Sequence, residues 1–133
     1  MFGAIPLAGT SYAAGCYGAS CDNQGPKGTG CDDDAITKYS TSLSDRVVQL
    51  RGSVTCRAAW ARVTNNADPS VYPSYATIEK YDGNGRLLKS LTIRTPTTGQ
   101  TDWTNMLGGE GVYFRACIRI DAGSSPISCT DKW

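Results

Sequence analysis

Six cysteines and a complete lack of histidine decide which chemistry is open to this chain. Without His there is no Ser-His or Cys-His nucleophile, no imidazole metal ligand and no imidazole base that titrates near neutral pH. An even number of Cys in a short chain favours disulfide bonds formed in an oxidising compartment. A zinc site is disfavoured because Cys16 and Cys21 are followed by Cys31 and the distant Cys56, with no second close pair.

The cysteine pairing can be read only in part. Cys117 and Cys129 bracket a predicted hairpin, so we expect them to pair, and closing that loop stabilises the fold by about 3 kcal/mol. The other four form two further bridges in one of three pairings, which the spacing leaves open. In any of these pairings at least one bridge must tie the N-terminal loop to the strand that carries Cys56. The four are Cys16, Cys21, Cys31 and Cys56.

Acidic residues in the cysteine-rich loop suggest calcium as a candidate ligand. Calcium takes six to eight oxygens from flexible loops, and extracellular modules accept weak affinity. We favour the simpler explanation of solvated turn residues, because the spacing does not match an EF-hand loop. The candidates are Asp22, Asp32, Asp33 and Asp34.

Catalytic groups are few. The only two Glu residues, Glu79 and Glu110, lie in or beside predicted strands, and a domain of this size has little room for a sugar cleft between paired acids. Ser42, Ser53 and Ser125 lie in strands or turns without a suitable S-x-x-K motif. We therefore expect a protein that is not an enzyme, with no catalytic residue and no cofactor.

Arginine and aromatic residues are the better candidates for recognition. The basic run of Arg46, Arg51, Arg57 and Arg62 has no acid between its members, and it either binds an anionic polymer or forms the outward face of two strands. Trp60, close to Cys56, is most simply a core residue. An exposed aromatic and arginine surface could stack on sugars or anchor a protein. Its candidates are Trp103, Tyr113, Arg115, Arg119 and Trp133.

Length and charge set the broad class. The chain has 133 residues and a net charge of +1, which argues against a strongly basic nucleic-acid binder. No apolar run approaches the roughly 20 residues of a membrane-spanning helix. We expect an N-terminal extension over residues 1–14, either a signal remnant or an added start, and a single disulfide-tied domain over residues 15–133.

Short strands separated by turns predict an all-β fold, an antiparallel sandwich or barrel with a Cys/Gly/Asp-rich N-terminal loop. In the segment 112–120, apolar residues alternate with Tyr113, Arg115 and Arg119, which indicates a half-buried strand. Residues 35–42 also fit a helical face, but their Ser and Thr content favours a strand. The predicted strands are 35–42, 46–51, 55–64, 75–81, 86–94, 102–107, 111–120 and 127–132.

Three blocks of this sequence carry a family resemblance. The first is Gly15-Cys16-Tyr17-Gly18-Ala19-Ser20-Cys21 with Pro26, Gly30-Cys31 and Asp34-Ala35-Ile36-Thr37; the second is Leu50-Arg51, Ser53, Thr55-Cys56-Arg57 and Trp60-Ala61-Arg62; the third is Trp103-Thr104-Asn105-Met106 with Arg115-Ala116-Cys117.

These blocks resemble the YjfA-like family of small secreted proteins of Gram-positive bacteria, a domain of unknown function, over about residues 15–117. Gly25 departs from the Asp that the family usually has before Pro26, and Gly52-Ser53-Val54 replaces a Tyr-Ser-Pro turn. The resemblance implies export and a disulfide-tied fold. It brings no activity, substrate or catalytic residue.

Together these observations predict a secreted, extracellular, non-catalytic binding module for an extracellular protein or a wall polysaccharide. A structural subunit of the cell surface or of an extracellular assembly is the alternative, and a small hydrolase or toxin the third. We expect no nucleic-acid partner and no membrane span, and self-association is compatible with either leading role. A binding module should show an exposed aromatic or arginine patch around a groove, whereas a structural subunit should show a long unpaired edge strand.

Overall fold

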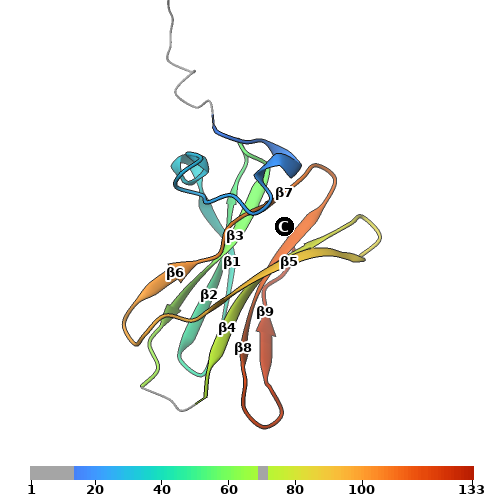
Figure 1. Cartoon of the computed structure of the whole chain (residues 1–133). Helices are drawn as coiled ribbons and strands as arrows, with labels where there is room; N and C mark the ends of the chain where they lie inside the picture. The colour runs from blue at the N-terminus through green and yellow to red at the C-terminus, as the bar shows by residue number, and fades with distance from the viewer. Residues whose placement is uncertain (1–13, 69–71) are drawn as a thin grey trace, which may run out of the picture.

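The fold is built on two antiparallel β-sheets packed face to face (Figure 1). The computed structural model describes residues 14–68 and 72–133. Within them the first sheet has the order β1-β2-β3-β6, with β7 also paired to β3, and the second has the order β5-β4-β8-β9. The strands are β1 (Ile36–Leu43), β2 (Arg46–Ser53), β3 (Ala58–Asn65), β4 (Ser74–Tyr81), β5 (Leu87–Arg94), β6 (Thr101–Trp103), β7 (Leu107–Gly108), β8 (Tyr113–Ile120) and β9 (Ile127–Cys129).

The main core lies between the two sheets and follows the alternation of each strand. Val48 and Leu50 of β2 face Ile78 of β4 and Ile118 of β8, and all four are fully buried. Burial along β8 has the predicted period of two, with Phe114 inside and Tyr113 outside. The all-β, disulfide-stabilised architecture is therefore confirmed, and it is a sandwich.

The element bounds correct the sequence prediction in a few places. The predicted strand 102–107 is two short strands, because the backbone of Met106 bonds to Asn23 and Gln24 of the N-terminal loop instead of continuing along β3. The strand predicted from residue 55 begins at Ala58, after a turn in which Arg57 has φ 52°. Residues 36–43 form a strand, as the Ser and Thr content favoured.

The N-terminal loop covers the outward face of β3 at one end of the sandwich (Figure 1). It contains two short 3-10 helices, η3 (Gly18–Cys21) and η4 (Cys31–Asp34). A second, smaller core forms beneath it from Trp60, Met106 and three of the cysteines, Cys21, Cys31 and Cys56. Since the loop has almost no aliphatic side chains of its own, cystine and tryptophan supply this apolar contact.

Gly108 allows the loop to approach the sheet closely. A Cβ at this position would collide with the carbonyl oxygen of Gly18, so any side chain would displace η3. Within the described ranges no helix is long and apolar enough to cross a bilayer. The N-terminal extension expected over residues 1–14 lies outside the described residues, apart from Ala14.

The three disulfides join Cys16 to Cys21, Cys31 to Cys56 and Cys117 to Cys129. Their sequence separations are 5, 25 and 12 residues, so the loops they close differ in length. A bridge that closes a longer loop removes more entropy from the unfolded chain. The second bridge also joins the N-terminal loop to the sandwich.

We expect removal of the Cys31–Cys56 bridge to cost more stability than removal of the Cys16–Cys21 bridge. On the chain-entropy model the double Ser variants lose about 3.5 and about 2 kcal/mol of unfolding free energy, respectively. Urea titration followed by circular dichroism measures both losses under the same conditions. A smaller loss for the Cys31→Ser/Cys56→Ser variant would show that this bridge does not anchor the loop.

Candidate ligand-binding site

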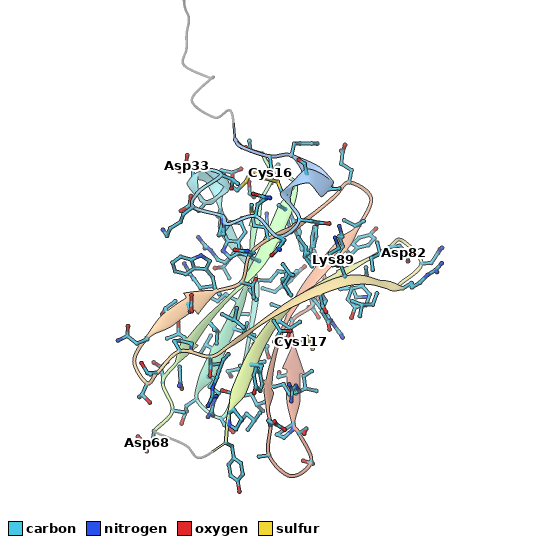
Figure 2. The ribbon with its side chains drawn as sticks, viewed as in Figure 1. Cys16, Asp33, Asp68, Asp82, Lys89 and Cys117 are labelled. Carbon is cyan, nitrogen blue, oxygen red and sulfur yellow. A yellow bond between two sulfur atoms is a disulfide. The ribbon has the colours of Figure 1, made fainter. Side chains whose placement is uncertain are left out.

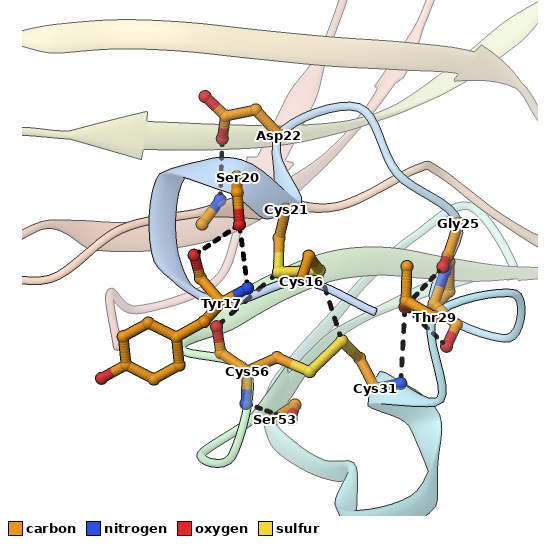
Figure 3. The surroundings of a disulfide bond; sticks show 12 residues. Cys16, Tyr17, Ser20, Cys21, Asp22, Gly25, Thr29, Cys31, Ser53 and Cys56 are labelled. Atoms are coloured by element: carbon orange, nitrogen blue, oxygen red, sulfur yellow. Dashed lines mark hydrogen bonds between the residues drawn. A yellow bond between two sulfur atoms is a disulfide. The ribbon is translucent and has the colours of Figure 1, made fainter. Parts of the chain in front are cut away.

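The four cysteines of the N-terminal region are gathered in one place (Figure 3). Their Sγ atoms all lie within 4.8 Å of one another, and the Sγ atoms of Cys16 and Cys31 are 3.7 Å apart. Such a cluster could ligate a metal as thiolates, but here all four sulfurs are in disulfides. In this state the cluster is a structural support for the loop.

Three of the four candidate calcium ligands, Asp22, Asp32 and Asp34, are directed to different partners. Asp34 accepts hydrogen bonds from the Ser53 hydroxyl (2.6 Å) and from the Thr55 backbone N–H (3.0 Å). Asp32 forms an ion pair with Lys27 at 3.3 Å. Within residues 14–68 and 72–133, no group of three carboxylates lies close enough together to share an ion.

Asp22 is the most constrained of these acids. Its carboxylate accepts hydrogen bonds from Lys80 Nζ (2.9 and 3.0 Å), Lys89 Nζ (3.0 Å) and the Gly108 backbone N–H (2.9 Å). Burial raises the pKa of Asp22, but the hydrogen bonds from Gly108 and the two lysines outweigh it, so the pKa is lowered overall. Because Lys80 belongs to β4 and Gly108 to β7, Asp22 ties the loop to both sheets.

A row of cationic and aromatic side chains crosses the outward face of the first sheet. The register places Arg51 of β2 beside Trp60 of β3, and Arg62 of β3 beside Trp103 of β6. All four are outward residues of their strands, and Lys27 from the loop lies 5.3 Å from the centroid of the Trp103 ring. They surround a cavity of about 140 Å³, whose walls are completed by Pro26 and Asp32. We call this the Trp–Arg cavity.

The charges of the Trp–Arg cavity are not balanced. Three cationic side chains and one carboxylate line it, which leaves a formal charge of +2. The hydrogen bonds of the two guanidinium groups go to neutral oxygens, from Arg51 to Thr37 (3.0 Å) and from Arg62 to Gln49 (2.8 Å). Neither arginine has an ion-pair partner among the described residues.

The Arg51 guanidinium shows the effect of this imbalance. Burial lowers the pKa of Arg51, the neighbouring Arg62 lowers it further, and Asp32 only partly compensates. Arg51 stays charged at any physiological pH, so the charged guanidinium carries the cost of burial first and the repulsion from Arg62 second. An anion placed between Arg51 and Arg62 would relieve that repulsion.

The sequence candidates for the recognition surface are spread over three places. Trp103 lines the Trp–Arg cavity, whereas Tyr113 and Trp133 line a second cavity. Arg115 and Arg119 lie on the outer face of the second sheet. Arg115 is bound to Glu79 at 2.6 Å, and Arg119 stacks 4.9 Å from the Tyr75 ring and lies 3.9 Å from Asp121. These two arginines already have partners.

The basic run is also divided. Arg46 points inward, is 5% exposed and donates to Ser74 Oγ at 2.9 Å. It borders a cavity of about 420 Å³ near Asp68, at the end of the molecule opposite Cys16 and Asp33 (Figure 2). We assign no site there. Only Arg51 and Arg62 of the run share one surface.

The two glutamates lie on different elements, Glu79 in β4 and Glu110 between β7 and β8. Glu79 accepts hydrogen bonds from Tyr81 (2.6 Å) and Arg115 (2.6 Å), and the Glu79 carboxylate raises the pKa of Arg115. Glu110 lies in the turn between β7 and β8 and is exposed. Glu79 is thus engaged in an ion pair on the outer face of the second sheet.

Comparison with known proteins gives a family but no activity. The family model described as "Protein of unknown function (DUF2690)" matches residues 19–117. The chain belongs to this family. All residues that line the Trp–Arg cavity fall inside the DUF2690 match, whereas Trp133 lies outside it. Neither the curated proteins nor the solved structures that were compared with the chain gave a match.

Sequence patterns did not predict Lys27 as a site residue, and they did not predict that Trp60 lines a cavity. Trp60 is only 3% exposed, so its interpretation as a core residue was reasonable. Lys27 lies between turn-forming residues and reaches the cavity only because the loop folds back over β3. No local pattern in a DUF2690 sequence would reveal that contact.

Replacing Asp22 by Asn should destabilise the protein, because Lys80, with 9% of its side chain exposed, is left buried without its counter-charge. We expect a loss of about 3 kcal/mol at pH 7. Since folding lowers the pKa of Asp22, its contribution is present above roughly pH 4 and is lost as the pH falls through the folded-state pKa. Urea unfolding of both proteins over a pH series measures the difference.

The matched control is Asp121→Asn, which removes an exposed carboxylate 3.9 Å from Arg119. It should change stability little at any pH. A loss for Asp22→Asn that stays constant from pH 7 down to pH 2 would contradict the electrostatic assignment and indicate a purely steric effect.

Proposed function

We propose that this protein is a secreted, non-catalytic binding module that holds an anionic cell-wall glycan at the Trp–Arg cavity. The observation that carries the proposal is the pair of half-buried guanidinium groups, Arg51 and Arg62, which line one cavity and have no ion-pair partner among the described residues. Arg115 on the other sheet, by contrast, is paired with Glu79. Placing like charges together has a cost that a ligand would offset.

The aromatic residues support a sugar over a simple inorganic anion. Trp103 is half-buried at the rim, so its ring offers an apolar surface against which a pyranose ring could stack. The arginines present planar donors that match carboxylate or phosphate oxygens. With a volume of about 140 Å³ the cavity takes one charged substituent, and the rest of the polymer would lie across the sheet.

The non-catalytic part of the proposal rests on the available side chains. The chain has no His, all six cysteines are in disulfides, and Glu79 is held by Arg115 and Tyr81. None of the groups around the Trp–Arg cavity is a base placed to activate water, since Asp32 is paired with Lys27. Binding requires none of these groups to move a proton.

Secretion and a Gram-positive source are part of the proposal. Three disulfides are compatible with an extracellular location, where such bonds persist. The resemblance to the YjfA-like secreted proteins supports the same location. An exported protein of this kind meets anionic wall polymers directly, which agrees with a binding surface of positive charge.

An oligosaccharide of galacturonic acid and its methyl ester provide a matched pair of probes, because esterification removes the charge and keeps the sugar. We expect the acid to bind and the ester to bind at least tenfold more weakly. Arg51→Gln and Arg62→Gln should each weaken binding of the acid about tenfold, which corresponds to about 1.4 kcal/mol per charge-assisted contact. Isothermal titration calorimetry at two salt concentrations measures the affinities, and higher salt should reduce them.

Arg119→Gln is the control, since Arg119 lies on the outer face of the other sheet and lines no part of the cavity. It should leave binding of the acid unchanged. Equal affinity for acid and ester, or equal losses in the Arg62 and Arg119 variants, would overturn the proposal.

A further inference from the structure

A second cavity lies at the end of β8 and is walled mainly by aromatic and aliphatic side chains. Val112, Tyr113, Phe114, Trp133 and Arg57 line it, and its volume is about 260 Å³. The ring centroids of Phe114 and Trp133 are 6.0 Å apart, and Trp133 packs so closely on Gly52 that a Cβ there would lie 2.5 Å from the indole. The aromatic wall is therefore firmly held.

Arg57 is the only charged side chain among the described residues that line this cavity, and it has an unusual conformation. Its backbone has φ 52°, in the left-handed region that Gly, Asn and Asp adopt more easily. The other described non-glycine residues with positive φ are Asn, Asp or Ser, which are common in turns. A long, charged side chain is uncommon at a position with positive φ, so the turn alone does not explain why Arg57 is there.

The Arg57 side chain is also incompletely satisfied. Its Nε is buried and has no hydrogen-bond partner among the described residues. Glu110 and Arg57 both act electrostatically on Tyr17, yet Arg57 forms no ion pair with any carboxylate that the structure describes. A buried donor without an acceptor lowers stability. The structure thus retains two unfavourable features at one residue.

We propose that the Arg57 cavity binds a small carboxylate attached to one apolar or aromatic group. The guanidinium would take the carboxylate, and the apolar group would lie against Trp133, Phe114 and Val112. Lys38 Nζ lies 4.3 Å from the centroid of the Trp133 ring, outside the set of residues that line the cavity. The volume is slightly below that of most drug-sized sites, so the ligand carries a single ring or branched side chain.

This site is independent of the proposed glycan site, because none of its five residues lines the Trp–Arg cavity. Two sources share the required chemistry. One is the carboxyl-terminal residue of a peptide with an apolar side chain, and the other is a free aryl or branched-chain acid. The arms of one experiment distinguish them.

The experiment titrates the intact protein with N-acetyl-phenylalanine, its amide and 3-phenylpropionate, and follows the Trp indole N–H resonances by NMR. We expect both acids to shift the Trp133 resonance with dissociation constants near the millimolar range, as befits ligands of this size. The amide, which lacks the charge, should bind at least tenfold more weakly. Tighter binding of N-acetyl-phenylalanine indicates a peptide terminus, and tighter binding of 3-phenylpropionate indicates a free acid.

Arg57→Asn tests the residue itself, because Asn tolerates the left-handed conformation and removes the buried donor. We expect at least a tenfold loss of acid binding with a melting temperature equal to or above that of the parent protein. Arg86→Gln, in the exposed turn before β5 with 79% of the Arg86 side chain accessible, is the control and should bind normally. Equal binding of acid and amide to the parent protein, or a lower melting temperature with unchanged binding in Arg57→Asn, would overturn the proposal.

Discussion

The Cys31–Cys56 disulfide is the constraint on which the rest of the structure depends. It fixes a loop that has almost no aliphatic residues onto the outward face of β3, where hydrophobic burial alone would be too small to hold it. Once the loop is fixed, Asp22 can reach Lys80 and Gly108, and Lys27 can reach Trp103. The polar contacts of the loop therefore depend on the covalent link.

Three acids of this chain are engaged with groups other than Arg51 and Arg62. Asp22 is shared by two lysines, Glu79 is held by Arg115, and Asp34 is used by Ser53 and Thr55. The nearly neutral net charge thus conceals a local excess of positive charge at the Trp–Arg cavity. An overall charge of +1 excludes a strongly basic surface, but it says nothing about how charges are paired.

The fold was largely predictable from the sequence, because strand alternation and turn residues are local signals. The period of two along residues 112–120 correctly placed β8, and the predicted strands 75–81 and 86–94 agree with β4 and β5. The split between β6 and β7 was not predictable, since it arises from hydrogen bonds between Met106 and a loop more than 80 residues away. Contacts of that kind have no local pattern.

The candidate site was predictable only in its residue types. The sequence indicated arginine and aromatic recognition, and Arg51, Arg62 and Trp103 do share one face of the first sheet. The sequence could not distinguish these residues from Arg115 and Arg119. The register between strands decides whether an acid lies beside an arginine, and the sequence does not reveal the register. The pairs Glu79–Arg115 and Arg62–Trp103 are set by that register.

The same disulfide also connects the two proposed sites. Cys31 closes the loop segment that supplies Pro26 and Lys27 to the Trp–Arg cavity, while Cys56 immediately precedes Arg57 of the second cavity. The two sites nevertheless differ in physical character. The first is lined by several charged side chains, so we expect ligand affinity there to depend on salt, whereas the second has one charged side chain among aromatic walls, and we expect affinity there to depend on burial. One covalent link can therefore hold two sites of different selectivity at the same end of a small sandwich.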